Sequence, residues 1–246
     1  MTTRYRCDND AKEEDLIPSN SLKPSGIRGV QTTRFCVVRH GETDWNANRK
    51  VQGQLDVQLS ATGHAQACAM AKRVGLGELA AIYTSDLCRA RHTAEAVACR
   101  IGLQPETRLD LRERHYGIFQ GLTYDEARKR FPDELVRHSG RDPDFTPSGG
   151  ENLFQFADRV IRCVSELEEK HREHSILVVT HGGVLDILYR YATGESLSAP
   201  RNFEIPNAAL NWFEISGGCW SVSVWADRSH LAETIDESPG VASWPV

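Results

Sequence analysis

The chain has 246 residues, of which 40% are hydrophobic, and its formal net charge is -5. This length and apolar content suit one α/β unit with a substantial core. The mixed charge argues against a protein that binds nucleic acid or an anionic membrane, since such proteins usually carry a basic patch. The 7 cysteines lack paired spacing, and we find neither an apolar signal-peptide core nor an apolar run that could span a bilayer. We therefore expect a cytoplasmic protein.

The beginning of the chain differs in composition from the rest. The first 33 residues are polar, charged and turn-rich, with few large apolar side chains. Such a segment cannot bury enough surface to fold by itself, so we expect a flexible N-terminal extension over residues 1–33. No linker or repeat divides the remainder, which predicts a single domain over residues 34–246.

Strand and helix signals alternate along that domain. Short apolar runs predict strands buried on both faces, and apolar residues spaced by three and four predict helices between them. This alternation indicates an α/β fold: three layers, α/β/α, around a mostly parallel central sheet. In chain order we expect a strand at 35–38, a helix from Ser60 to Gly75, a strand at 81–84, a helix capped by Ser85 or Asp86 and ended by Gly102, a short helix at 124–131, a Pro/Gly/Asp-rich loop to Gly150, a long helix at 153–167, a strand at 176–179, a helix at 184–191 and a hairpin at 207–226.

Two of the expected strands end in a histidine that is followed by glycine. These histidines are His40 and His181. In open α/β sheets, ligands bind beyond the carboxyl ends of the strands, so the two side chains should converge on one site. A third strand leads into Arg89 in the first turn of a helix, where free N–H groups favour anions. Because guanidinium groups match phosphate geometry, Arg39 and Arg89 indicate a phosphate site around the histidines.

Seven segments carry a further signal through their order along the chain. They read RHGETDWN (39–46), QG (52–53), LSATGHAQA (59–67), SDLCRARHTA (85–94), LRERHYG (111–117), GGEN (149–152) and VTHGG (179–183). This series resembles the histidine phosphatase superfamily, whose fold is also called phosphoglycerate mutase-like, over nearly all of residues 34–231. The resemblance implies that fold and makes residues 34–246 a single catalytic domain.

The resemblance also implies roles for individual residues. His40 would carry the phosphoryl group as a covalent phosphohistidine, and Glu113 would act as general acid and then general base. No metal is implied, because arginines supply the positive charge; His171 and His174 are interpreted as solvated. The other implied site residues are Arg39, Arg89 and His181 for charge stabilisation, and Asn46, Gln52, Gly53, Gly182, Arg114 and Tyr116 for substrate binding.

The superfamily contains phosphatases and phosphoglycerate mutases, and the sequence gives signals for both. Glu113 to Gly117 reads as in the mutases, and Arg114 and Arg141 could contact an acidic substrate. However, Tyr124 replaces a lysine of the mutases, the segment between Arg137 and Gly149 is short, and the last strand ends in His-Gly-Gly rather than His-Gly-Asn.

We therefore predict a phosphomonoester hydrolase without a cofactor that acts on a small phosphorylated metabolite, as a monomer or homodimer. One alternative is a phosphoglycerate mutase primed by 2,3-bisphosphoglycerate. A remote alternative is a non-catalytic protein that binds phosphorylated ligands.

Overall fold

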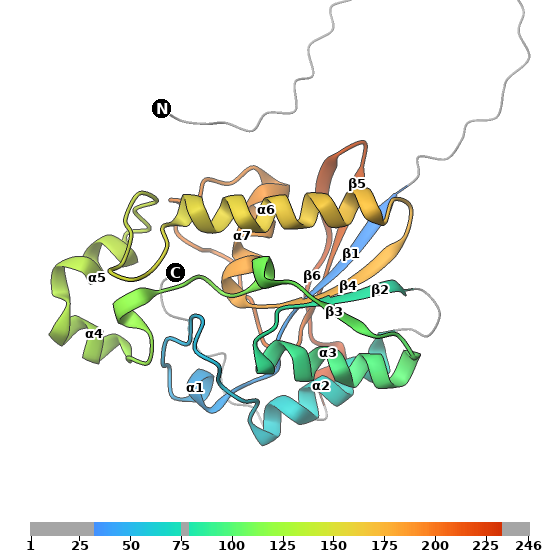
Figure 1. Cartoon of the computed structure of the whole chain (residues 1–246), viewed down its shortest axis with the longest axis horizontal. Helices are drawn as coiled ribbons and strands as arrows, with labels where there is room; N and C mark the ends of the chain where they lie inside the picture. The colour runs from blue at the N-terminus through green and yellow to red at the C-terminus, as the bar shows by residue number, and fades with distance from the viewer. Residues whose placement is uncertain (1–31, 75–78, 233–246) are drawn as a thin grey trace, which may run out of the picture.

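A six-stranded sheet forms the centre of the computed structural model, which describes residues 32–74 and 79–232 (Figure 1). Its strand order is β3-β2-β4-β1-β5-β6. The first four strands are mutually parallel, whereas β5 and β6 form an antiparallel hairpin at one edge. The predicted, mostly parallel sheet is confirmed. The strands are β1 (Thr33–Arg39), β2 (Leu79–Thr84), β3 (Pro105–Thr107), β4 (Ser175–Thr180), β5 (Leu210–Ser216) and β6 (Cys219–Asp227).

Helices cover both faces of this sheet. Alternate side chains of a strand point to opposite faces, so each central strand contributes apolar residues to two cores. In β1, Phe35 and Val37 pack into the apolar core beneath α6 and α7, and Cys36 and Val38 pack into the core beneath α2 and α3. Figure 1 shows the two helix layers on either side of the sheet. The predicted three-layer α/β/α fold is confirmed. The α-helices are α1 (Asp44–Ala47), α2 (Ala61–Arg73), α3 (Cys88–Ile101), α4 (Tyr124–Arg130), α5 (Pro132–Ser139), α6 (Leu153–Lys170) and α7 (Gly182–Thr193).

Both ends of the chain lie outside the described residues, including the last residues of the predicted domain. Residues 1–31 of the predicted extension are not among them, nor are residues 75–78 and 233–246. Thr33, which we had assigned to the extension, is the first residue of β1.

The start of α3 differs from the prediction. Neither Ser85 nor Asp86 caps this helix: its N-cap residue is Leu87, whose side chain makes no capping bond. Instead, Asp56 Oδ1 accepts a hydrogen bond of 2.7 Å from the backbone N–H of Cys88. The cap comes from a loop 32 residues earlier in the chain, so no local pattern announces it.

The segment between β3 and α6 contains one helix more than the sequence indicated. The short helix α4 is confirmed, but the Pro/Gly/Asp-rich stretch predicted as a loop begins with α5. Pro132 occupies the first turn of α5, where its missing N–H costs nothing. A small third core, which includes Phe119, Leu135 and Phe145, holds this region together.

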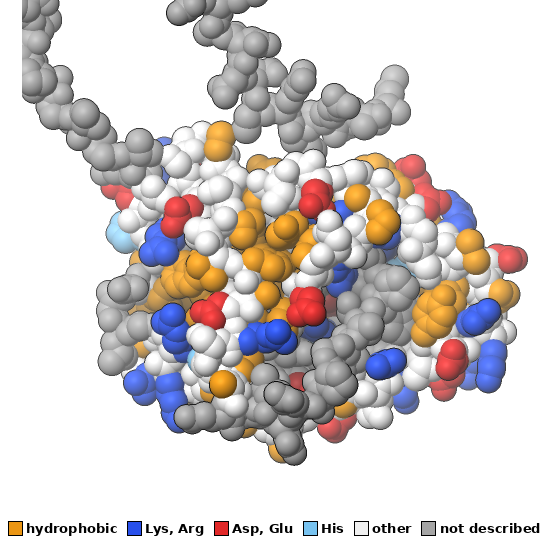
Figure 2. Space-filling model, turned by 180° about the vertical axis from the view of Figure 1, so that it is seen from behind, with side chains coloured by type: hydrophobic (Ala, Val, Ile, Leu, Met, Phe, Trp, Pro, Cys, Tyr) orange, Lys and Arg blue, Asp and Glu red, His pale blue; other side chains and the backbone are white. Residues whose placement is uncertain are grey.

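The face seen from behind mixes charges of both signs around exposed apolar side chains (Figure 2). No large area of a single sign stands out on this face, apart from what the grey atoms cover. Within the described ranges, none of the helices is both long and apolar enough to cross a bilayer.

Candidate active site

His40 lies at the carboxyl end of β1 and is 3% exposed. Its Nδ1 lies 2.7 Å from the carbonyl oxygen of Gly41. Because a carbonyl can only accept a hydrogen bond, the ring proton belongs on Nδ1. On the other side of the ring, Arg89 Nε donates to His40 Nε2 over 3.3 Å. Both contacts describe a neutral imidazole with its lone pair on Nε2.

A second histidine faces the first. His181 follows β4, and its ring centroid lies 5.2 Å from that of His40. Burial, together with the charge of Arg89, holds the pKa of both histidines well below 6.5. Both ring nitrogens of His181 are buried without a partner among the described residues. Since buried polar atoms are normally paired, these nitrogens mark a place where a polar ligand could be bound.

Two arginines surround His40: Arg89 is fully buried, and Arg39 is partly buried. Arg39 Nη1 donates to the carbonyl of Ile205 over 2.7 Å. The guanidinium of Arg89 donates to the carbonyls of Gly53 over 2.7 Å and Leu55 over 2.8 Å. Burial lowers the pKa of each arginine to about 10, so both remain cationic near neutral pH. The site therefore concentrates positive charge around a neutral imidazole.

Arg89 also fixes the loop that contains Gln52 and Gly53. Gly53 has a φ of +54°, and a Cβ there would lie 2.1 Å from Gln120 Oε1, so the position requires glycine. The Gln52 side chain is 8% exposed, and its Oε1 has no partner among the described residues. Both predicted substrate-binding positions thus lie beside the predicted anion-binding arginine.

Glu113 reaches the site from the segment between β3 and α4. Its Oε1 accepts from the backbone N–H of Arg114 over 2.8 Å, and its Oε2 accepts from that of Gly183 over 3.0 Å. Gly183 is the second residue of α7, which starts directly after His181. The carboxylate therefore lies at a helix N-terminus beside His181. The structure brings together all five residues that were predicted to be catalytic.

Two further predicted residues border His40. Asn46 Oδ1 accepts from the backbone N–H of Thr43 over 3.1 Å and closes the cap of α1. Gly182 is the first residue of α7, and a Cβ added to it would lie 3.6 Å from Arg39 Nε. Asn207, which the sequence reading did not identify, donates to the carbonyl of His40 over 2.8 Å. No local pattern could have identified Asn207, because it stands 167 residues after His40 in the chain.

Arg114 and Tyr116 lie together, with the guanidinium carbon 5.7 Å from the ring centroid. Burial lowers the pKa of Arg114 and raises that of Tyr116. Arg114 Nε donates to the carbonyl of Glu151 over 3.0 Å, so the side chain also holds the loop before α6.

Arg141 does not fit the suggested contact with an acidic substrate. It is 4% exposed and donates to the buried Asp186 over 2.7 Å. Arg190 and Arg201 pair with the same carboxylate. Although burial opposes ionisation, these arginines hold the pKa of Asp186 below its ordinary value. Arg141 thus belongs to a buried ionic cluster.

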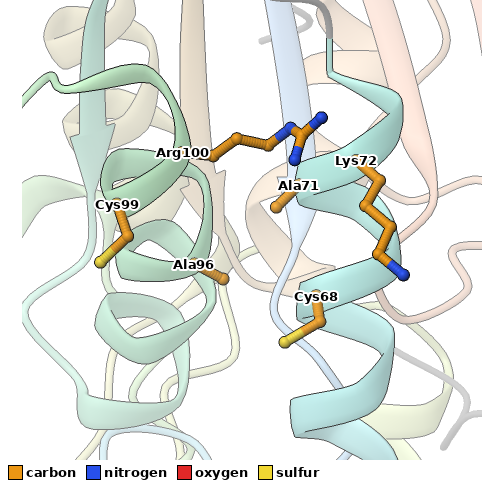
Figure 3. A pocket seen from close by; sticks show the side chains of 6 residues that line it. All are labelled: Cys68, Ala71, Lys72, Ala96, Cys99 and Arg100. Carbon is orange, nitrogen blue, oxygen red and sulfur yellow. The ribbon is translucent and has the colours of Figure 1, made fainter.

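The described residues also contain an open groove of about 510 Å³ between α2 and α3 (Figure 3). The thiols of Cys68 and Cys99 come from the two facing helices, with Lys72 and Arg100 beside them. None of the predicted site residues lines it. The strand ends, where buried cations and histidines converge, are the better candidate for chemistry.

No three His, Cys, Asp or Glu side chains within residues 32–74 and 79–232 are grouped so that they could hold a metal ion. His171 ring Nε2 lies 2.8 Å from the hydroxyl of Tyr83. His171 is therefore half-buried beside the sheet, whereas the sequence indicated a solvated side chain.

Residues 35–228 match the histidine phosphatase superfamily (branch 1), a class of enzymes whose members include phosphatases and phosphoglycerate mutase-like proteins. The chain belongs to this superfamily and is an enzyme. Phosphoglycerate mutase-like protein 4 of Arabidopsis thaliana is 43% identical, over 83% of this chain and 90% of its own length. A metal-independent phosphoserine phosphatase of the same plant is 37% identical, over 82% of this chain and 84% of its own. A mycobacterial glucosyl-3-phosphoglycerate phosphatase has a similar structure, with a TM-score of 0.71 and 30% identity, over 80% of this chain and 99% of its own.

Proposed function

We propose that the protein is a phosphomonoester hydrolase that forms a phosphohistidine at Nε2 of His40. The observation that carries this proposal is the hydrogen bond from Nδ1 to the carbonyl of Gly41. It places the lone pair of a neutral imidazole on Nε2, the nitrogen beside the guanidinium of Arg89. A neutral imidazole whose lone pair faces fixed positive charge suits attack on a phosphoryl group.

The proposed reaction has two steps. First, Nε2 of His40 forms a bond to phosphorus while the P–O bond of the ester breaks and Glu113 donates a proton to the leaving oxygen. In the second step, the Glu113 carboxylate takes a proton from water, the water oxygen bonds to phosphorus, and the P–N bond breaks. His40 returns as neutral imidazole and Glu113 as the acid, so the enzyme is regenerated.

Charge stabilisation in this proposal comes from side chains. Arg39 and Arg89 would neutralise the oxygens of the transferring group, and the unpartnered ring nitrogens of His181 would bind one of them. The two arginines would supply the positive charge that a metal ion supplies elsewhere, and we propose that no metal ion is needed. The metal-independent relative supports this.

We further propose that the substrate is a small phosphorylated metabolite with a carboxylate. The names of the three relatives refer to phosphoserine and to phosphoglycerates, all of which are phosphorylated carboxylic acids. Arg114 remains predicted to contact an acidic group of the substrate, and Tyr116 remains a predicted substrate-binding residue. Cytoplasmic location and a monomeric or homodimeric state also remain predictions.

A mutase is the second candidate, favoured by the Glu113 to Gly117 segment and by the mutase-like relative. Incubation with 3-phosphoglycerate, with and without 2,3-bisphosphoglycerate, separates the two functions. A phosphatase releases inorganic phosphate without forming 2-phosphoglycerate. Isomerisation that bisphosphoglycerate stimulates, with little phosphate release, would replace the hydrolase by the mutase.

The direct test is to trap the intermediate. The wild type, His40→Ala and Glu113→Gln would be mixed with a ³²P-labelled phosphomonoester and quenched in alkali, where phosphohistidine is stable. We expect label on the wild type, none on His40→Ala, and turnover reduced by about 10⁴-fold or more in His40→Ala. Activity should persist in EDTA. An unlabelled wild type with undiminished turnover in His40→Ala would refute the covalent mechanism.

A further inference from the structure

The segment that carries Glu113 has little regular structure of its own. Between β3 and α4, the described chain forms only two 3₁₀ turns, Leu109–Leu111 and Gly117–Phe119. Glu113 lies between these turns and belongs to no strand of the sheet; the nearest bond from a strand is that of the Thr180 hydroxyl to the carbonyl of Leu111, two residues earlier. An acid that must reach a leaving oxygen within hydrogen-bond distance needs a defined position. Its backbone must therefore be held by other groups.

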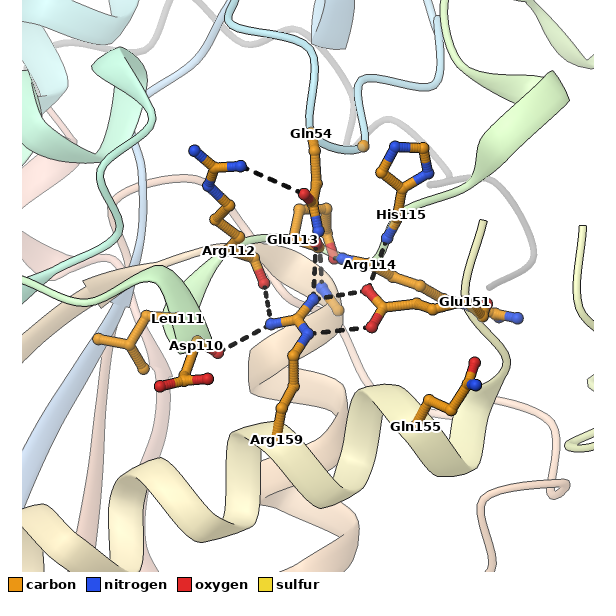
Figure 4. A network of polar contacts seen from close by, with 12 residues as sticks. Gln54, Asp110, Leu111, Arg112, Glu113, Arg114, His115, Glu151, Gln155 and Arg159 are labelled. Atoms are coloured by element: carbon orange, nitrogen blue, oxygen red, sulfur yellow. Dashed lines mark hydrogen bonds and ion pairs between the residues drawn. The ribbon is translucent and has the colours of Figure 1, made fainter. Parts of the chain in front are cut away.

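Arg159 supplies that hold from the middle of α6 (Figure 4). Its Nη1 donates to the carbonyls of Asp110 and Arg112, each over 2.8 Å. Its Nη2 donates to the carbonyl of Glu113 itself over 2.9 Å. One guanidinium thus binds three carbonyls of the acid-bearing segment.

Glu151 keeps Arg159 in this orientation. Its carboxylate accepts two hydrogen bonds from the guanidinium, of 2.6 and 3.0 Å. The same carboxylate accepts from the backbone N–H of His115 over 2.7 Å. The Arg159 and Glu151 side chains are only 15% and 16% exposed, so this pair is far better shielded than a surface salt bridge. The Arg159–Glu151 pair therefore grips the segment on both sides of Glu113.

The carboxylate end of Glu113 is fixed separately, by the backbone N–H of Gly183. The Glu113 carbonyl is held from α6 and also accepts from the Gln54 side chain over 3.1 Å, while the Glu113 side chain is held from α7, so the acid is anchored at three places. Removal of the α6 anchor would leave the carboxylate bonded to α7 but free to shift with its backbone. Lysine at position 159 keeps the charge but lacks the fork that reaches several acceptors at once.

We propose that Arg159, oriented by Glu151, is the positioning residue for the general acid Glu113. This inference rests on the proposed function, in which Glu113 protonates the leaving oxygen. The acid matters most for esters with poor leaving groups, such as alkyl phosphates. It matters little for p-nitrophenyl phosphate, whose leaving group departs as an anion. Loosening of the acid should therefore change the dependence of the rate on the leaving group.

The experiment compares kcat/KM for p-nitrophenyl phosphate and for the alkyl ester β-glycerophosphate in four proteins: the wild type, Glu113→Gln, Arg159→Lys and Arg162→Lys. Arg162 is the matched control, because it lies on the same helix, is 60% exposed and pairs with Asp158. We expect Glu113→Gln to lose about 10²–10⁴-fold on the alkyl ester and much less on the aryl ester. Arg159→Lys should show the same pattern at about 10–10²-fold, since a displaced acid keeps part of its effect, and Arg162→Lys should match the wild type.

Each other outcome is decisive. Equal losses of Arg159→Lys on both esters, or none, together with a leaving-group-dependent loss in Glu113→Gln, would overturn the inference and leave the proposed function standing. The absence of leaving-group dependence in Glu113→Gln would remove the proposed acid, and the inference with it. If Arg159→Lys fails to fold by thermal melting, Glu151→Gln replaces it, with the same expected pattern and the same overturning result.

Discussion

The two sides of the site are held in place in different ways. The nucleophile side consists of His40, Arg89 and the loop at residues 53–55. His40 stands at the end of a central strand, and Arg89 bonds to His40 and to two carbonyls of that loop. The acid side is the segment around Glu113, which has no strand and is held by Arg159 from α6 and by Glu151, which lies just before that helix. The sheet thus fixes the nucleophile, whereas the position of the acid depends on a few polar contacts that single substitutions can remove.

One residue links the two sides. Gln54, from the loop that Arg89 holds, donates to the carbonyl of Glu113 over 3.1 Å. The acid is therefore placed relative to the nucleophile as well as to the helices. Substitutions on the nucleophile side should lower the rate for every substrate. Substitutions on the acid side should lower it mainly for esters with poor leaving groups.

Apart from loss of His40 or Glu113 itself, the largest effect should come from Arg89→Lys, which damages the nucleophile side. Lysine cannot bond at once to His40 Nε2 and to two carbonyls, so kcat/KM should fall by about 10²–10³-fold. The loss should be similar for aryl and alkyl esters. Arg91→Lys is the control, because Arg91 lies on the same helix, is 48% exposed and pairs with Glu95. A loss confined to alkyl esters would contradict the division between the two sides.

Gly183→Ala should displace the acid without touching His40. Its added Cβ would lie 2.2 Å from Glu113 Oε1, closer than side chains tolerate. We expect kcat/KM for alkyl esters to fall by about tenfold or more, with little loss for p-nitrophenyl phosphate. Gly182→Ala should lose less, because its Cβ would meet Arg39 Nε at 3.6 Å. Similar kinetics in the two variants would show that the acid is not sensitive to this contact.

The pH dependence of stability should reflect the buried histidines. Burial, with Arg114 and Arg141 nearby, lowers the pKa of His138 to about 3, and the pKa values of His40 and His181 are also lowered. Between about pH 3 and 6.5 the unfolded chain then binds more protons than the folded one. The contribution of these histidines to the free energy of unfolding is therefore fully present above pH 6.5 and is lost as the pH drops. Each such group contributes at most about 1.4 kcal/mol per pH unit.

Urea unfolding at pH 7.5, 6.0 and 5.0 measures this slope. The aspartates with lowered pKa values contribute only in more acidic solution, below their ordinary 3.8. His138→Gln should reduce the loss of stability between pH 6.0 and 5.0. An unchanged slope in that variant would mean that His138 does not carry the effect.

The smallest effects should be those of two variants near the start of α3, of which Asp56→Ala removes the cap of this helix on the nucleophile side. Loss of the bond to the N–H of Cys88 should lower the free energy of unfolding by about 1 kcal/mol. Asp86→Ala, at the position predicted to be the cap, removes a partly exposed ion pair with Arg112 and should cost less. Thermal melting of both variants decides the point, and a larger loss in Asp86→Ala would contradict the assigned cap.

Strong local patterns predict the fold, the two histidines and the two arginines, whereas Glu113 was predicted through the family resemblance. Apolar runs mark β1 and β4, and His40 and His181 follow them directly, so the site could be predicted from strand ends. The cap of α3 could not, because Asp56 acts across 32 residues. The helix α5 was missed because Pro132 and its neighbours resemble a loop, although proline fits the first turn of a helix.

The contacts around Glu113 were also beyond local patterns. Arg159 stands next to Val160, and the periodicity of α6 reports only which face is apolar. The three carbonyls that Arg159 binds lie 46 to 49 residues earlier in the chain. An arginine in a helix is usually solvated, so nothing in the sequence distinguishes this one. Arg141 was misread for the same reason: its carboxylate partner, Asp186, is 45 residues away.

The carbonyl of Gly41 determines how long a phosphoryl group would stay on the enzyme. With the Nδ1 proton retained there, the ring becomes an imidazolium as soon as Nε2 is bonded to phosphorus. Neutral imidazole can then depart when water attacks, and no further protonation of the ring is needed. In the proposed intermediate, a hydrogen bond on the opposite side of the ring would thus keep the P–N bond reactive. Such an intermediate favours rapid passage to water over storage of the phosphoryl group.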